Sequence, residues 1–176
     1  MNFIATDLEG AYIIEIEAHE DERGFFARAW CEDEFLEHGL NPKMKQCNIS
    51  FNHKKGTLRG MHYQMDPYGE VKIVRCTKGA IFDVVIDLRL NSSTYKQHVS
   101  VELNEENRRM LYIPEGFAHG FQTLEDNTEV FYQMASSFVP EAANGVRWND
   151  SVFNIKWPEE KNRVISARDK TYADFS

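Results

Sequence analysis

Short segments in which apolar and polar residues alternate dominate this sequence, and they limit the folds that the chain can adopt. They are rich in Val, Ile, Phe and Tyr and cover residues 11–17, 71–76, 80–88, 97–103, 109–114, 118–124 and 129–135. A period of two residues is typical of half-buried strands. Only residues 32–38 have a good helical pattern, which Gly39 is placed to end. Many closely spaced strands and almost no helix predict an all-β sandwich or barrel, not a parallel sheet with crossover helices.

The length of the chain and the even mixing of its residue types indicate one domain. The 176 residues contain no low-complexity stretch, internal repeat or linker. Charged and apolar residues stay mixed from end to end, so we expect a single domain over residues 1–176. A chain of this length buries roughly 70% of its extended surface on folding and needs no disulfide or metal to fold.

The charge balance excludes two kinds of partner. Asp and Glu number 28 against 20 Lys and Arg, which gives a formal net charge of -8. Nucleic acids and anionic membranes attract proteins with excess Lys and Arg, so we expect neither as a partner. No apolar run is long enough to span a bilayer, and the first twenty residues lack the basic start of a signal peptide.

The cysteines predict a reducing environment. Cys31, Cys47 and Cys76 are widely spaced and form no C-x-x-C pair. This pattern is typical of reduced thiols in a cytoplasm and gives no support for a zinc site. We therefore predict a cytoplasmic protein whose cysteines act mainly as small buried hydrophobes.

Polar residues occupy positions where a strand should present apolar side chains. Read as a strand, residues 56–64 place His62 and Gln64 on one face, with open space beside Gly60. A lone histidine is usually satisfied inside a sheet, but other polar residues lie nearby in the sequence. Gln46 and Asn48 precede it at alternate positions, and Lys72 and Arg75 follow in the next predicted strand. Such an inward polar face indicates a binding cavity. Strict alternation sends Arg59 to the opposite face, and a bulge at Gly60 would re-aim it.

A second cluster lies in the segment IPEGFAHGF, residues 113–121. It places Phe117, His119 and Phe121 on one face of a strand. His119 is therefore either a packed core residue or the polar group of an aromatic-lined pocket. On their own, Tyr132 reads as a cross-strand aromatic and Asp169 as a solvated tail residue.

Two histidines in a β-rich chain first suggest a metal-binding cupin. A typical metal site of that class has an H-x-H motif, a later Glu and a further His, whereas this chain has His62-Tyr-Gln64. Glu70 and His119 remain, but such a mixed set is weak support for a transition metal, and Lys72 would repel a cation. A metal-dependent cupin oxygenase or isomerase stays the alternative hypothesis, and we predict no metal and no cofactor.

Several sequence blocks together resemble one known family. In chain order they are DERGFF (21–26), QCNIS (46–50), GTLRGMHYQ (56–64), KIVR (72–75), FDVVIDLR (82–89), IPEGFAHGF (113–121), RWND (147–150) and IKWP (155–158). They resemble the dTDP-4-dehydrorhamnose 3,5-epimerase family and span nearly the whole chain. The resemblance implies a cupin-type jelly roll, a homodimer without metal or other cofactor, and a nucleotide-diphosphate sugar as substrate in deoxysugar biosynthesis.

The resemblance also implies a catalytic set for a nucleotide-linked 4-keto-6-deoxyhexose, whose C4 ketone acidifies the protons on C3 and C5. By resemblance, His62 is the base and is paired with Asp169, because a carboxylate on one imidazole nitrogen makes the other a better proton acceptor. Tyr132 is the acid on the opposite face of the sugar. Lys72 suits the stabilisation of the enolate oxygen.

A further set of residues carries over from the family as substrate-binding: Arg23, Phe26, Gln46, Cys47, Asn48, Arg59, His119, Phe138 and Arg168. The guanidinium groups of Arg23 and Arg59 suit a diphosphate. Four positions depart from the family pattern, with Arg28 and Ala143 where Glu is frequent, Phe138 where Tyr is common, and Arg168 where Lys is common. They leave open a different nucleotide, or an epimerase specific for C3 or C5 alone. A sugar-binding module without catalysis is the third hypothesis.

Overall fold

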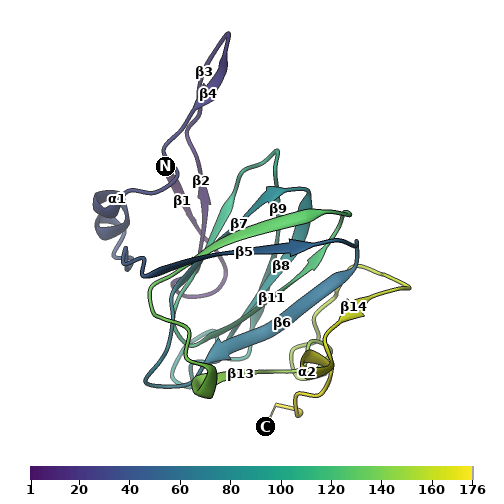
Figure 1. Ribbon diagram of the computed structural model, residues 1–176. Helices are drawn as coiled ribbons and strands as arrows, with labels where there is room; N and C mark the ends of the chain where they lie inside the picture. Colours follow the sequence, from purple (N-terminus) through teal and green to yellow (C-terminus); the bar gives the residue numbers. More distant parts are fainter. Residues whose placement is uncertain (176) are drawn as a thin grey trace.

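Two antiparallel sheets lie face to face in the computed structural model, which describes residues 1–175 (Figure 1). The first sheet has the order β1-β2-β10-β7-β12-β5. Its strands are β1 (Asn2–Ala5), β2 (Tyr12–Glu15), β10 (Met110–Ile113), β7 (Lys72–Lys78), β12 (Thr128–Met134) and β5 (Gln46–Asn52). The second has the order β13-β6-β11-β8-β9, and β14 (Val164–Ile165) pairs parallel with β6. Its strands are β13 (Ala143–Gly145), β6 (Thr57–Gln64), β11 (Phe117–Thr123), β8 (Ala80–Asp87) and β9 (His98–Asn104).

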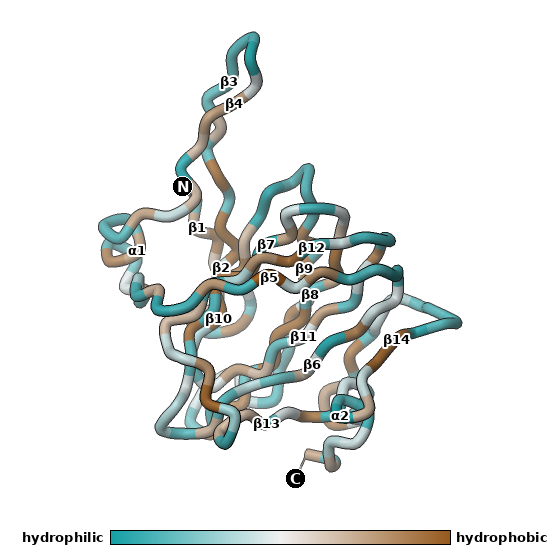
Figure 2. Tube along the Cα trace, viewed as in Figure 1, coloured by the Kyte–Doolittle hydropathy of each residue, from teal (hydrophilic) through white to brown (hydrophobic). Residues whose placement is uncertain are grey.

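The core follows from the alternation of each strand. Inward-facing residues of both sheets, such as Val74, Leu111, Val85 and Phe117, form one buried cluster. The outer face of the first sheet packs against α1 (Glu32–Glu37) through Phe35. Figure 2 shows hydrophobic residues concentrated in the strands of the two sheets and hydrophilic residues in the connecting loops. The arrangement is a cupin-like jelly roll, so the predicted all-β fold class is confirmed.

Each strand predicted from alternation is present within one or two residues of its expected ends. The predicted helix over residues 32–38 is present as α1, which ends at Glu37. Gly39 follows the C-cap residue His38, and its positive φ of 69° suits glycine. β5, of seven residues, was not among the predicted strands. The short elements were not predicted either: β1, β13, β14, the hairpin of β3 (His19–Asp21) and β4 (Gly24–Phe26), the 3₁₀ turn Pro140–Ala142, and α2 (Ala167–Lys170). They are too short for a periodic pattern to form.

The cysteines agree only partly with their predicted burial. Cys76 is buried, and burial raises the pKa of its thiol to about 12. Cys31 is half-buried, and Cys47 is exposed on β5. All three are free thiols. In residues 1–175, no helix is long and apolar enough to cross a membrane.

A bulge in β6 aims two polar side chains at the same space. His62 pairs with His119 and Arg59 with Phe121, so β6 carries one residue more than β11 between these pairs. The bulge that the sequence left open at Gly60 is therefore present. The open space expected beside Gly60 is not, because a Cβ there would lie 2.5 Å from the Cα of Gly120. Only glycine allows this approach and the φ of 126°.

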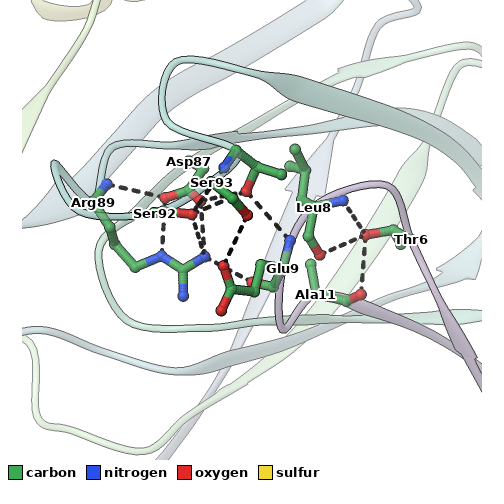
Figure 3. Close-up of polar contacts among 9 residues, drawn as sticks. Thr6, Leu8, Glu9, Ala11, Asp87, Arg89, Ser92 and Ser93 are labelled. Atoms are coloured by element: carbon green, nitrogen blue, oxygen red, sulfur yellow. Dashed lines mark hydrogen bonds and ion pairs between the residues drawn. The ribbon is translucent and has the colours of Figure 1, made fainter.

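Buried Asp87, at the end of β8, organises the loop that follows (Figure 3). Its carboxylate accepts hydrogen bonds from the side chains of Arg89, Ser92 and Thr94, at 2.5–2.9 Å. Arg89 also donates to the carbonyl of Glu9, at 2.7 Å, in the loop between β1 and β2. This network joins the two sheets and contains none of the predicted site residues.

Candidate active site

A cavity with two lobes lies between the sheets. One lobe has a volume of about 370 Å³ and the other of about 330 Å³. His62, Lys72 and Tyr132 line both, so the lobes meet at these three side chains. The first lobe continues along Arg59, His119 and Phe121, and the second along Gln46, Asn48, Phe138, Ala143 and Arg168. A larger open groove lined by residues of the segment 148–163 contains none of the predicted site residues.

His62 on β6 is held by Asp169 on α2. The imidazole Nε2 lies 2.8 Å from Oδ1 of Asp169, whose other oxygen accepts a hydrogen bond from the N–H of Gly60 at 3.2 Å. Burial by itself raises the pKa of Asp169, but the hydrogen bonds from His62 and Gly60 outweigh it and hold the pKa below its usual value. Asp169 is only 4% exposed, so the expectation of a solvated tail residue is wrong. α2, capped by the Ser166 hydroxyl, carries it back under β6.

Tyr132 belongs to the other sheet. β12 carries its side chain into the cavity from the first sheet, whereas His62 enters from the second. Burial raises the pKa of Tyr132, the charge of Glu70 raises it further, and Arg59 works against both. The phenol therefore stays protonated at neutral pH, on the wall opposite the imidazole.

Three basic side chains of the first lobe, His62, Lys72 and His119, each have a carboxylate behind them. Asp169 is 2.8 Å from His62, Glu70 is 2.5 Å from Lys72, and Asp83 is 2.7 Å from His119. The carboxylate side chains are at most 6% exposed. Burial raises the pKa of Asp83, with His119 opposing that rise. Each pair offsets much of the desolvation cost of its base.

Two arginines in the cavity are held by neutral groups instead. Arg59 Nε donates to the side-chain oxygen of Asn52 at 2.7 Å, and Arg168 donates to the carbonyl of Ala143 at 2.9 Å. Their positive charge is not offset by a paired carboxylate in these contacts. The cavity thus combines compensated bases with uncompensated guanidinium groups.

The structure brings most of the predicted site residues together, but not all. Outside the cavity lining are Cys47, which is exposed, and the hairpin residues Arg23 and Phe26. The Arg23 side chain is 84% exposed, and Phe26 is 75% exposed. Figure 1 shows why, because the β3–β4 hairpin projects away from the two sheets. Arg28 also lies elsewhere and pairs with Glu34 at 2.7 Å.

Sequence reasoning assigned no role to Asp83 and considered Glu70 only as a metal ligand. Both are buried charged residues that contact predicted site residues. A signal for Asp83 is present in the sequence, because an acidic residue interrupts the apolar strand Ile-Phe-Asp-Val-Val over residues 81–85. Glu70 precedes β7 in a loop and has no such signal.

The side chains of the metal hypothesis are engaged in other contacts. Gln64 hydrogen bonds to Glu70 and to backbone groups, and Glu70 pairs with Lys72. Among residues 1–175, no group of three His, Cys, Asp or Glu side chains could hold a metal ion. The arrangement instead places an imidazole and a phenol on opposite walls, which is a geometry for moving protons.

This fold and site define a cupin-like jelly roll with an acid–base cavity between its sheets. The family model described as dTDP-4-dehydrorhamnose 3,5-epimerase matches residues 5–176. The enzyme of that name from Methanothermobacter thermautotrophicus is 44% identical over 173 residues, which cover 97% of this chain and 92% of the relative. The chain belongs to the dTDP-4-dehydrorhamnose 3,5-epimerase family.

Solved structures of family members have the same fold. That of dTDP-4-dehydrorhamnose 3,5-epimerase from Elizabethkingia anophelis has a TM-score of 0.96 and 37% identity, and the match covers 99% of this chain and 96% of that one. That of the epimerase from Legionella pneumophila, in complex with dTDP-4-keto-L-rhamnose, has a TM-score of 0.90 and 36% identity, covering 96% and 89%. These similarities support the epimerase hypothesis and not the metal-dependent alternative.

Proposed function

We propose that this protein is an isomerase that inverts C3 and C5 of dTDP-4-keto-6-deoxyglucose through an enolate and yields dTDP-4-keto-L-rhamnose. The observation that carries the proposal is the position of the His62–Asp169 pair on one sheet, opposite Tyr132 on the other. Epimerisation requires a base and an acid on opposite faces of the sugar, and a group that holds the enolate oxygen. The cavity supplies candidates for all three.

His62 is the proposed base. One ring nitrogen is occupied by Asp169, at 2.8 Å, which leaves the other free to accept the proton from C3 or C5. The imidazolium that forms is stabilised by the adjacent carboxylate, whose depressed pKa keeps it charged. Asp169 is thus the proposed partner that fixes the tautomer and orientation of the base.

Tyr132 is the proposed acid. Inversion requires that the new proton arrives on the face opposite to the one that lost it, because return to the same face regenerates the substrate. A protonated phenol on the opposite wall meets this requirement, and its raised pKa keeps the proton available. Positioned acids and bases of this kind contribute roughly 10²–10⁴-fold each.

Lys72 is the proposed partner of the enolate oxygen. Lys72 lines both lobes together with the proposed base and acid, and its ammonium pairs with Glu70. Stabilisation of a developing oxyanion by one such donor is typically worth about 3–4 kcal/mol in the transition state.

Arg59 and Arg168 are the proposed binding groups for the diphosphate. Both are held by neutral partners, so their charge remains available for phosphate oxygens, and guanidinium can bind phosphate in a bidentate fork. Arg168 lines the second lobe together with Gln46, Asn48 and Phe138, which are proposed contacts for the nucleotide. His119 is a proposed sugar contact in the first lobe.

We also propose that the protein acts as a homodimer in which the β3–β4 hairpin of one subunit reaches the cavity of the other. Arg23 and Phe26 are implied substrate contacts, yet they are exposed on a hairpin that extends away from its own subunit (Figure 1). A hairpin of this shape has few contacts of its own to keep it in place, and a second subunit would supply them. The cytoplasmic location predicted from the sequence stays a prediction.

The test is deuterium uptake in heavy water. Purified protein is incubated with dTDP-4-keto-6-deoxyglucose and, in parallel, with UDP- and GDP-linked 4-keto-6-deoxy sugars, and NMR measures deuterium at C3 and C5. We expect uptake at both carbons of the dTDP sugar. Uptake at one carbon only reassigns the protein as a monofunctional epimerase, and uptake at neither with any of the sugars rejects the function.

A further inference from the structure

Lys72, Glu70 and Gln64 form a buried row of hydrogen-bonded polar side chains, and the proposed reaction gives a role only to Lys72. Oε1 of Glu70 is 2.5 Å from the Lys72 ammonium, and Oε2 of the same carboxylate accepts a hydrogen bond from Nε2 of Gln64 at 3.0 Å. Gln64, Glu70 and Lys72 are 5%, 8% and 8% exposed. Burying three linked polar side chains costs free energy unless each is hydrogen-bonded, so we expect this arrangement to serve a function.

We infer that Glu70 and Gln64 are positioning residues, which hold the Lys72 ammonium at the place where the enolate oxygen develops. The inference rests on the proposed function, in which the Lys72 ammonium stabilises the enolate oxygen. Neither Glu70 nor Gln64 contacts the reacting atoms in this account. Both act through Lys72.

Glu70 gives the ammonium a fixed place. A lysine side chain is a flexible four-carbon stem with high rotamer entropy, so an ammonium without a partner samples several positions. An oxyanion donor is effective only when it already points at the developing charge, because reorganisation during the reaction costs free energy. An ion pair behind Lys72 restricts its side chain before substrate arrives and also offsets the cost of burying its charge.

Gln64 fixes the carboxylate in turn. Its amide group donates to the carbonyl of Tyr68 at 3.0 Å as well as to Glu70, and its Oε1 accepts from the N–H of Val139 at 2.6 Å. The loop before Glu70 and the segment after Ser137 are therefore both tied to β6 by one side chain. The glutamine amide has two N–H donors and an acceptor oxygen for these three partners, whereas a neutral histidine has only one donor and one acceptor.

The hydrogen bonds of Gln64 also link the proposed nucleotide end of the cavity to its centre. Phe138, a proposed nucleotide contact, lies between Ser137 and Val139, and its own N–H donates to Gln46 at 3.1 Å. Gln64 thus holds the segment at the nucleotide end of the cavity and the carboxylate behind the lysine at its centre. Glu70 also adds to the raised pKa of Tyr132, which helps to keep the proposed acid protonated.

The test is a double-mutant cycle that combines Glu70→Gln with Lys72→Met. Glu70→Gln should lower kcat about 10–100-fold and change KM less than about threefold, since the loss falls on transition-state binding. In the Lys72→Met background the same Glu70 substitution should cost less than about threefold, because the group that it positions is gone. Glu70→Asp, with a shorter reach, should lie between wild type and Glu70→Gln.

Asp87→Asn is the matched control. Asp87 is also a buried, ion-paired carboxylate, but its network contains none of the predicted site residues. It should lower the unfolding temperature and leave kcat unchanged. Equal kcat losses for Glu70→Gln in both backgrounds, or wild-type kcat in Glu70→Gln, would overturn the inference.

A crystal structure of the Glu70→Gln variant provides a readout that does not depend on activity. We expect the Lys72 ammonium to be displaced or to occupy more than one position, whereas Asp87→Asn should leave it in place. An unmoved, single Lys72 conformer contradicts the inference. Absence of exchange with the wild-type enzyme would instead reject the proposed function, and this structure would still decide the role of Glu70. Glu70→Asp serves the same purpose should Glu70→Gln not fold.

Discussion

At the scale of single residues, three basic side chains of the cavity are paired with carboxylates that are buried from solvent. His62, Lys72 and His119 each face the cavity, and their acidic partners lie behind them with little or no exposure. The acids hold the bases in position. In the proposed reaction they would act through the bases and not by touching the substrate.

Asp169→Asn tests this arrangement at the proposed base. The amide has no charge to stabilise an imidazolium, so kcat should fall by about 10²–10⁴-fold. Product formation from dTDP-4-keto-6-deoxyglucose, followed by NMR, measures it. The control is Asp174→Asn, which removes another acid of the same C-terminal segment, one that pairs with Arg147 at the surface. Wild-type kcat in Asp169→Asn would show that His62 needs no charged partner.

The sequence was informative about the residues that face the cavity and less so about those behind them. His62, Lys72 and Tyr132 stand at strand positions that alternation sends inward, so their meeting could be predicted once the motifs were in view. Asp169 could be paired with His62 only through family resemblance, because a short helix gives no periodic signal. Glu70 sits in a loop, where no pattern predicts burial.

At the scale of elements, the bulge in β6 shapes the cavity and the loop after β8 joins the two sheets, and strand periodicity predicts neither feature. The bulge lets Arg59 and His62 both line the first lobe, although they are three positions apart. Gly60, which lies against Gly120, was the sequence signal for the bulge. Glycine weakens the interior of a strand, so its presence there often marks a bulge or a close approach of two backbones. The Asp87 network could not be predicted, because it joins loops that are far apart in the sequence.

Asp87→Asn tests the stabilising role of that network. Burial raises the pKa of Asp87, but hydrogen bonds from Arg89, Ser92 and Thr94 outweigh burial and lower the pKa to about 2. A carboxylate with a depressed pKa stabilises the fold above its unfolded pKa near 4, and this contribution is lost as the pH falls through about 2. At pH 7 the substitution should lower the free energy of unfolding by about 2 kcal/mol.

Urea denaturation at pH 7 and at successively lower pH measures the difference between the two proteins. The gap between wild type and Asp87→Asn should narrow between about pH 4 and pH 2. A gap that stays constant with pH would mean that the stabilisation does not come from the charge of Asp87.

At the scale of the whole molecule, the β3–β4 hairpin separates two implied substrate contacts from the cavity that they should serve. The all-β class and the longer strands of the two sheets followed from alternation and from the scarcity of helix. The hairpin did not, because its exposed residues bury nothing in their own subunit and so leave no hydrophobic pattern. The homodimer that we propose would bring the hairpin of one subunit to the cavity of the other.

Mixing two inactive variants tests the exchange of hairpins. His62→Ala removes the base, and Arg23→Ala removes a contact carried by the hairpin, so each alone should be inactive or strongly impaired. After unfolding and refolding together, the mixed dimer has one site with an intact base and an intact hairpin from its partner. About one quarter of wild-type activity should return, since half of the dimers are mixed and each has one complete site. No recovery would show that each hairpin serves its own subunit.

The central claim is that His62 removes a proton from one face of the sugar and Tyr132 returns one to the other. Position-resolved NMR of deuterium and configuration at C3 and C5, in heavy water, compares wild type with His62→Ala and Tyr132→Phe. The account predicts exchange and inversion at both carbons for wild type, neither for His62→Ala, and exchange with impaired inversion for Tyr132→Phe. Full exchange in His62→Ala, or normal inversion in Tyr132→Phe, would contradict it.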